Sequence, residues 1–352
     1  MAHTFNISPE TRAGTLHFLY RQFFVRPPPV SRQTADLTGK TAIITGSNSG
    51  LGLETARQLI DLGAKVILAV RDESKGSEAC LQLSEGRTLL PGSITVWKLD
   101  LSSYDSIIEF VSRARNLESL DIAVLNAGVY NVHEAFSSTG YEEDIQINYL
   151  SNILLTILLL PVIKIKSIGP GPGRIILVTS DVAAWSKFEE RKSDPLLPVF
   201  QKPAASWNMS ERYGTSKLLG QLFLTELVRH ISPTEVIVTC TNPGFCRGSN
   251  LGRQAQGTLY FAYQIMTGLI GRSCSVGART IVHAAAVLQE EVHGQYVEDA
   301  KIQPLPPLVY SKEGEIIRKR LYEETLTALS FAGLRDILQN KRLGTDMTQK
   351  SM

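Results

Sequence analysis

Residues Lys40 to Gly52, K-T-A-I-I-T-G-S-N-S-G-L-G, form the stretch that decides the fold. An apolar, β-branched run over 41–45 breaks into Gly46, Gly50 and Gly52, and an amphipathic segment follows. This order predicts a strand, a tight turn and a helix. Such a turn brings bare backbone N–H groups to the positive end of a helix dipole, so it suits a phosphate or pyrophosphate. For the glycines taken alone, the alternative is an ordinary strand-to-helix loop.

Strands and helices alternate along the rest of the chain. Further strands are predicted at 64–70, 93–101, 120–125, 174–179 and 235–241, with a last one at 294–297. Helices are predicted at 102–115, 141–165, 218–230, 278–289 and 314–331. This alternation indicates an α/β fold, a doubly wound (Rossmann) parallel sheet in a single domain over 37–340. Two inserts interrupt this alternation: a polar one at about 181–210 and one with an apolar segment at about 245–275. We expect both to form walls of the substrate-binding side.

Two terminal segments flank this domain: an N-terminal extension, 1–36, and a tail, 341–352. The extension carries no pattern of a cleaved signal. Its aromatic stretch 16–30 ends in three prolines and predicts an amphipathic helix ending at Pro27. That helix could pack on the domain, on a partner or peripherally on a membrane surface, and we expect it to pack on the domain.

Composition excludes several classes of protein. The 352 residues are 43% hydrophobic, 20% charged and carry a formal charge of +2, which gives no argument for nucleic acid as a partner. The most apolar run, 153–165, is too short to span a bilayer and contains Pro161 and Lys164, so it predicts a buried helix or a homodimer interface. The cysteines have no disulfide or metal-site spacing, so we expect free thiols, no metal and a cytoplasmic protein. They are Cys80, Cys240, Cys246 and Cys274.

The end of the second strand carries the residues that would read an adenosine ribose. A dinucleotide fold places an acid there for a free 2′-hydroxyl and a cation for a 2′-phosphate. Arg71 comes first and favours NADP over NAD, although Asp72 next to it could face the ribose and reverse this preference.

Four candidate catalytic residues lie further along the chain. Tyr213 and Lys217 are four residues apart, which on a helix places both side chains on one face, where a cation favours the ionised form of a phenol. Ser180 ends the fifth strand, and Asn148 lies within a predicted helix. Each has an ordinary alternative: a core tyrosine beside a solvated lysine, a helix-capping serine, and a locally bonded asparagine.

Taken together, these features resemble the short-chain dehydrogenase/reductase family, strongly over 37–244. The N-terminal extension and the wide spacing between Ser180 and Tyr213 are similar to a fungal branch akin to retinol-dehydrogenase-like members. The resemblance implies that Tyr213 is the acid/base, that Lys217 lowers the tyrosine pKa and holds the nicotinamide ribose, and that Ser180 binds the substrate oxygen. It implies that Asn148 holds a water in the proton relay. The implied cofactor contacts are Gly46, Ser47, Asn48, Gly50, Leu51, Gly52, Arg71, Asp100, Leu101, Asn126, Ala127, Gly128, Tyr213, Lys217, Pro243 and Gly244.

The sequence also departs from the family pattern. Phe245-Cys246-Arg247 follows Pro243-Gly244 where a threonine is common, which puts a contact to the nicotinamide carboxamide in doubt. Asp181, directly after Ser180, could tune the serine or cap a turn. We expect an NADP(H)-dependent oxidoreductase that acts on a ketone or secondary alcohol of a fairly large apolar metabolite, in fungal secondary metabolism. The alternative is a cofactor-bound protein that transfers no hydride and serves as a binding module or cyclisation scaffold.

Overall fold

The glycine-interrupted stretch folds as a strand, a turn and a helix. In the computed structural model, which describes residues 5–169, 171–252 and 257–339, β1 (Thr41–Thr45) leads into α3 (Gly50–Asp61). The chain returns through β2 (Lys65–Val70), which pairs with β1 in parallel. A strand–helix–strand crossover between two parallel neighbours is the unit of a parallel sheet.

Eight strands form the central sheet in the order β10-β9-β6-β5-β4-β1-β2-β3. All neighbours pair in parallel except β10, which is antiparallel to β9. The predicted doubly wound sheet is confirmed, and the sequence missed only β10 within it. The remaining strands are β3 (Ile94–Lys98), β4 (Ile122–Leu125), β5 (Gly173–Val178), β6 (Val236–Asn242), β9 (Tyr296–Glu298) and β10 (Lys301–Gln303), with a separate pair β7 (Cys246–Arg247) and β8 (Arg272–Ser273).

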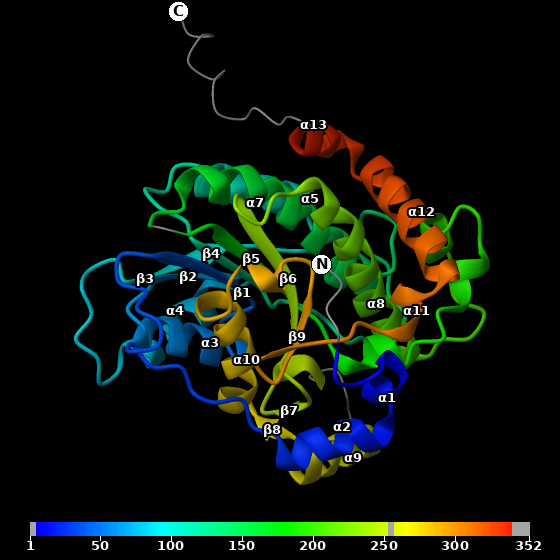
Figure 1. Cartoon of the computed structure of the whole chain (residues 1–352), viewed down its shortest axis with the longest axis horizontal. Coiled ribbons are helices and arrows are strands. Elements are labelled where there is room, and N and C mark those ends of the chain that lie inside the picture. The colour runs from blue at the N-terminus through cyan, green and yellow to red at the C-terminus, as the bar shows by residue number, and fades with distance from the viewer. Residues whose placement is uncertain (1–4, 170, 253–256, 340–352) are drawn as a thin grey trace, which may run out of the picture.

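Helices cover both faces of the sheet (Figure 1). One face packs on α3, α4 (Glu73–Ser84) and α10 (Cys274–Ala286), and the other on α5 (Tyr104–Ala114), α7 (Asn152–Lys166) and α8 (Met209–Leu227). Neighbouring strand residues alternate between the two cores: Ile43 lies in one and Ile44 in the other. Burial on both faces explains why the strands are continuous apolar runs.

The helix predicted at 141–165 is present and buried. α6 (Glu143–Ile145), a π-helical turn (Gln146–Ser151) and α7 join into 24 residues, which by length and composition alone could cross a membrane, since an 18-residue window within them has a mean hydropathy of 1.7. Of that window, 94% is buried inside the fold, which confirms the predicted buried helix. Its apolar side chains at 153–160 are at most 7% exposed, so they form core, as one alternative predicted, and leave no face for the homodimer interface.

The N-terminal segment packs on the domain, as expected. α1 (Pro9–Ala13) and α2 (Thr15–Phe24) lie below the sheet in Figure 1, where α2 contacts α9 (Gly257–Ile270). The helix ends at Phe24, three residues before Pro27. Arg12 and Arg21 are buried there, which makes the segment part of the folded body.

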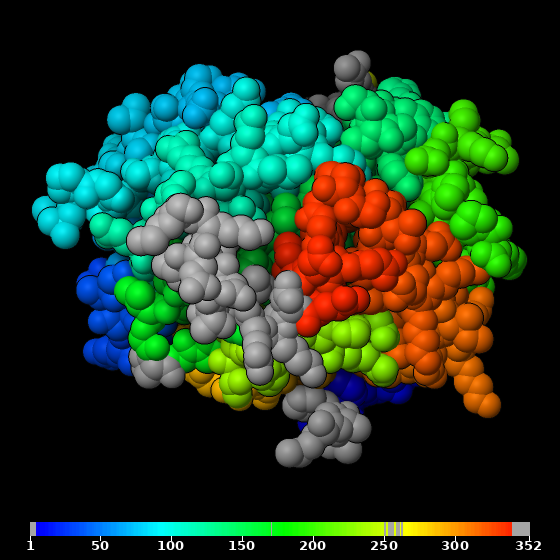
Figure 2. Space-filling model, turned by 90° about the horizontal axis from the view of Figure 1, so that it is seen from above, coloured from blue at the N-terminus to red at the C-terminus, as the bar shows by residue number. Residues whose placement is uncertain are grey.

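The C-terminal helices complete the molecule. α11 (Pro307–Tyr310) leads into α12 (Lys312–Ala328), which packs on α8, and α13 (Leu334–Gln339) packs on α7. In the space-filling view, α12 and α13, orange to red, form one continuous patch of this face (Figure 2). The predicted tail, 341–352, lies outside the described residues. All four cysteines are free thiols, as expected.

Candidate active site

The carboxyl ends of six parallel strands, β1 to β6, open into one large cavity of about 750 Å³. Loops with chemical groups gather at this edge because the strands of a parallel sheet all end on the same side. Both inserts reach the cavity, as expected of substrate-side walls: the first through Val182 and Trp185, the second through Phe245, Tyr263 and Met266. The cavity is also lined by the predicted residues Gly46, Asn48, Leu51, Arg71, Asp100, Leu101, Asn126, Ala127, Gly128, Ser180, Tyr213, Lys217, Pro243 and Gly244.

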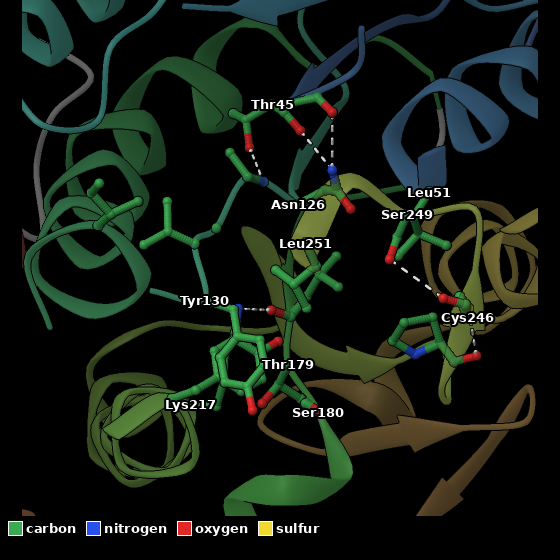
Figure 3. A pocket seen from close by; sticks show the side chains of 18 of the residues that line it. Thr45, Leu51, Asn126, Tyr130, Thr179, Ser180, Lys217, Cys246, Ser249 and Leu251 are labelled. Atoms are coloured by element: carbon green, nitrogen blue, oxygen red, sulfur yellow. Dashed lines mark hydrogen bonds between the residues drawn. The ribbon is translucent and has the colours of Figure 1, made fainter. Parts of the chain in front are cut away.

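The glycine loop closes one end of the cavity. Gly46 has a φ of +64°, which a residue with a side chain adopts at a cost. A Cβ on Gly52 would lie 2.4 Å from the Gly46 carbonyl oxygen and 2.6 Å from Asn126 Nδ2. The Asn126 amide donates to the Thr45 carbonyl oxygen at 2.9 Å, which ties the loop to β4 (Figure 3). The glycines therefore let the backbone pack closely.

Three predicted cofactor residues do not line the cavity. Ser47 is fully buried, and its hydroxyl donates to the Ile44 carbonyl oxygen at 2.8 Å. Gly50 and Gly52 lie in the first turn of α3, behind the loop. The turn itself uses the Ser47 hydroxyl, so a contact of this residue with the cofactor would come from its backbone and stays a prediction.

The next part of the cavity presents cations. Arg71 and Lys75 both line it, and so does Asp72, whose carboxylate caps α4 by accepting hydrogen bonds from Ser74 N at 3.0 Å and Ser74 Oγ at 2.6 Å. Those hydrogen bonds lower the pKa of Asp72. Asp100 is likewise used locally, since its carboxylate accepts from the backbone N–H and hydroxyl of Ser102.

Tyr213 and Lys217 stand one turn apart on α8, and both are nearly buried. Lys217 Nζ lies 5.7 Å from the Tyr213 ring centroid and donates to the Val178 carbonyl oxygen at 3.1 Å. Burial lowers the pKa of Lys217 to about 8. Burial also raises the pKa of Tyr213, helped by Asp144 and Tyr130, so the implied lowering of this pKa by Lys217 does not dominate in the protein alone.

Ser180 completes this group at the end of β5. It is the N-terminal residue of a short 3₁₀ turn, but its side chain makes no capping hydrogen bond, which removes the ordinary alternative. The Ser180 hydroxyl is a hydrogen-bond partner of the Tyr213 phenol, and this hydrogen bond lowers the pKa of Tyr213. Figure 3 shows Ser180, Lys217 and Tyr130 converging on one side of the cavity.

Asn148 lies just behind the cavity wall. It occupies the π-helical turn, a local feature that is frequent at functional sites. Its amide accepts from Val129 N at 2.8 Å, and donates to the Val129 carbonyl oxygen at 2.9 Å and to Ser216 Oγ at 3.0 Å. Asn148 thus fixes the loop after β4 against α8 through bonds to residues 19 and 68 positions away, so it is not the locally bonded asparagine of the ordinary alternative.

The sequence missed the contribution of the N-terminal helices to the cavity. Phe18 on α2 lines it and packs edge-on against Trp185 with 5.2 Å between ring centroids. Trp185 Nε1 in turn donates to the Ala13 carbonyl oxygen at 2.8 Å. The aromatic character of the extension was the available signal, but nothing in the sequence told which ring points inward.

A buried ionic cluster holds this segment beside Ser180. Asp181 neither caps a turn nor faces solvent: Arg21 Nη1 lies 3.1 Å from its carboxylate, and Arg12 lies 3.6 Å away. Arg21 also pairs with Asp299 at 2.9 Å and with Glu298. Burial and Glu298 raise the pKa of Asp181 to about 6. For Glu298 itself, burial is outweighed by Arg12 and Arg21, which lower its pKa to about 2.

The residues present fit a dinucleotide. A Cβ at Gly52 would fill the close-packed turn at the N-terminus of α3, whose first N–H groups have no side-chain cap. At the opposite end, the Lys217 ammonium donates one hydrogen bond within the described part of the chain, so its remaining N–H groups can bind a ribose. The cavity connects the two ends without interruption.

Comparison with known proteins agrees with this geometry. The family model described as short chain dehydrogenase matches residues 40–189. The chain is 56% identical to short-chain dehydrogenase fogG of Aspergillus ruber, over 97% of this chain and 99% of that one. It is 42% identical to short chain dehydrogenase/reductase mfmJ of Annulohypoxylon moriforme, over 95% and 98%.

Solved structures share the fold. An uncharacterized protein from Mycobacterium paratuberculosis superposes with a TM-score of 0.62 at 24% identity, over 86% of this chain and 98% of that one. A protein of Escherichia coli CFT073 complexed with NADPH gives 0.56 at 19% identity, over 78% and 100%. The expected family, including its fungal members, is therefore confirmed: the chain belongs to the short-chain dehydrogenases, a family of oxidoreductases.

Proposed function

We propose that the protein transfers a hydride between NADP(H) and a ketone or secondary alcohol of an apolar small molecule. The observation that carries this proposal is the meeting of Tyr213, Lys217 and Ser180 at one end of a cavity whose other end is the glycine loop. An acid/base, a cation and a hydroxyl are the groups that carbonyl reduction needs.

In the reducing direction, the Tyr213 phenol donates its proton to the carbonyl oxygen of the substrate. When bound, the nicotinamide supplies the hydride to the carbonyl carbon. The Ser180 hydroxyl donates a hydrogen bond to the same oxygen as negative charge develops there. Lys217 favours the phenolate that remains, and its ammonium binds the ribose. Asn148 keeps the Val129 loop in register, and a water beside it returns the proton to Tyr213.

Two cations favour NADP over NAD. Arg71 and Lys75 line the adenosine end, where a 2′-phosphate would sit, and the Asp72 carboxylate is turned toward its own helix as a cap. An acid engaged in this way is poorly placed to accept hydrogen bonds from a 2′-hydroxyl. We also propose the other cofactor contacts that the sequence predicts, because most of those residues line the same cavity.

Apolar side chains on the substrate side favour a fairly large apolar substrate. Phe18, Trp185, Phe245, Tyr263 and Met266 make up much of that wall. We place the reaction in fungal secondary metabolism because the relatives named above come from filamentous fungi, and in the cytoplasm because the cysteines are free thiols.

The test is Tyr213→Phe, which removes the phenolic proton and keeps the ring. Turnover of an apolar ketone should fall by about 10²- to 10⁴-fold. Titration with NADPH should give an unchanged Kd, and NADPH should bind more tightly than NADH. Tyr20→Phe is the matched control, because Tyr20 is 55% exposed and does not line the cavity.

Two results would contradict the proposal. Undiminished turnover in Tyr213→Phe would remove the tyrosine from the mechanism. The wild-type protein could also bind NADPH and yet consume none of it with a panel of ketones and aldehydes. That result would support the non-redox alternative, a binding module or cyclisation scaffold.

A further inference from the structure

An exposed apolar face lies on the outer side of α2 and α9. The two helices contact each other and run side by side at the bottom of Figure 1, on the far side of the sheet from α12 and α13. Leu16 is 85% exposed and Phe24 76% on α2, and Leu269 is 72% and Phe261 68% on α9. Exposed apolar side chains are normal singly, but a group on two adjacent helices marks an interaction surface.

The residues of this face come from two stretches of sequence that contain no acidic side chains. No aspartate or glutamate occurs in residues 15–35 or 245–289, although the whole chain has 34. Basic side chains remain there: Arg26, just after α2, and Arg247, in β7 next to α9, are exposed. The face therefore combines apolar side chains with positive charge, and its partner must be apolar and negatively charged.

This face is continuous with the entrance of the cavity. Phe18 of α2 and Met266 of α9 line the cavity, and Met266 is also 45% exposed. The helices that carry apolar residues outward thus form the substrate wall on their inner side. A molecule leaving an apolar phase at this face would reach the cavity without crossing a polar surface.

We propose that the α2–α9 face docks on the surface of an anionic lipid bilayer. The exposed leucines and phenylalanines enter the boundary between headgroups and acyl chains, and the arginines bind lipid phosphates and carboxylates. A second copy of the chain fits poorly, because pairing two such faces would bring like charges together with no acid to compensate them. Helices of 10 and 14 residues are too short to span, so the contact is peripheral.

The experiment is co-sedimentation of the full chain with vesicles. One set is phosphatidylcholine alone, and the other contains about 30% phosphatidylserine, which supplies the negative surface potential. We expect binding to the second set that weakens as salt is added. The readout needs no turnover, so its failure and the failure of the proposed hydride transfer are distinguishable.

Paired variants locate the surface. Phe24→Gln with Leu269→Gln should lower the fraction bound at least tenfold, because each loses an inserted apolar side chain. Leu81→Gln with Leu90→Gln is the control, since these leucines are equally exposed, at 73% and 80%, but lie elsewhere. Equal binding by both double variants, or wild type that sediments with neither vesicle, would overturn the proposal. So would a dimer in light scattering that only the Phe24 and Leu269 changes dissociate, because a second copy would then cover the face.

Discussion

The half of the cavity that we assign to the nucleotide (the nucleotide half) and the half that we assign to the substrate (the substrate half) are built on different principles. The nucleotide half comes from consecutive strands, β1 to β4, whose ends carry Gly46, Arg71, Asp100 and Asn126. The substrate half is assembled from residues 5–36, the insert 181–210 and the segment 245–275, which are distant in sequence. Backbone geometry shapes the first half, and buried ion pairs and aromatic packing hold the second. The difference predicts that substitutions in each half fail in different ways.

Breaking the ionic cluster should have the largest effect. Arg21→Met leaves Asp181, Glu298 and Asp299 with one cation fewer in a buried setting, so the free energy of unfolding should fall by about 3–5 kcal/mol. Urea unfolding followed by fluorescence measures the loss. Activity with any ketone should fall with it, because Asp181 adjoins Ser180.

An exposed ion pair supplies the control. Lys192 pairs with Glu189 at 2.8 Å, with side chains 69% and 65% exposed. Lys192→Met should cost below about 1 kcal/mol. If both variants lose the same stability, the cluster does not hold the substrate half.

A side chain added at the glycine turn should have the next largest effect, and this effect should be on cofactor binding alone. Gly52→Val places side-chain atoms against the Gly46 carbonyl oxygen and Asn126, so the loop must shift. We expect the Kd for NADPH to rise by about 100-fold, in line with other losses of an essential close contact. Gly220→Ala, in open space on α8, should leave the Kd unchanged. A fold that survives with normal NADPH affinity would show that the loop tolerates a side chain there.

The same contrast explains what the sequence could predict. Gly46, Tyr213 and Ser180 follow from short-range patterns, because a turn, a helical spacing and a strand end each place a residue within its own element. The partners of Asp181 could not be found this way, since Arg12 and Arg21 lie about 160 positions earlier on helices whose packing depends on the finished fold. The hydrogen bond of Ser47 could not be found for a related reason: the sequence locates the residue in the loop but does not reveal that the turn uses its hydroxyl.

A smaller effect, on the pH dependence of stability, should come from Asp144. Asp144 is buried beside Asn148, and burial together with Glu142 raises its pKa to about 8. The native protein therefore keeps a proton that the unfolded chain loses near pH 4, so this group stabilises the fold at low pH and that contribution is lost as the pH rises to about 8.

Asp144→Asn should remove this pH dependence. Because Glu142 shares the titration, we expect the difference in unfolding free energy between pH 5 and pH 8 to change by about 2 kcal/mol. Urea unfolding at the two pH values measures it, with the exposed Asp105→Asn as the matched carboxylate control. Parallel pH profiles for wild type and Asp144→Asn would mean that Asp144 is ionised in the folded protein.

The smallest effect should come from the substrate wall, and it separates the halves most cleanly. Phe18→Ala removes a ring that lines the cavity and packs on Trp185, yet leaves the ionic cluster of α2 in place. For a large apolar ketone, kcat/KM should fall by about 3- to 10-fold, the effect of losing part of one aromatic contact. A small ketone that does not reach Phe18 should be turned over as before, and the Kd for NADPH should not change. Phe23→Ala on the same helix is the matched control, since Phe23 is 50% exposed and does not line the cavity. Equal losses for large and small ketones would mean that Phe18 supports the fold of the substrate half without contacting the substrate.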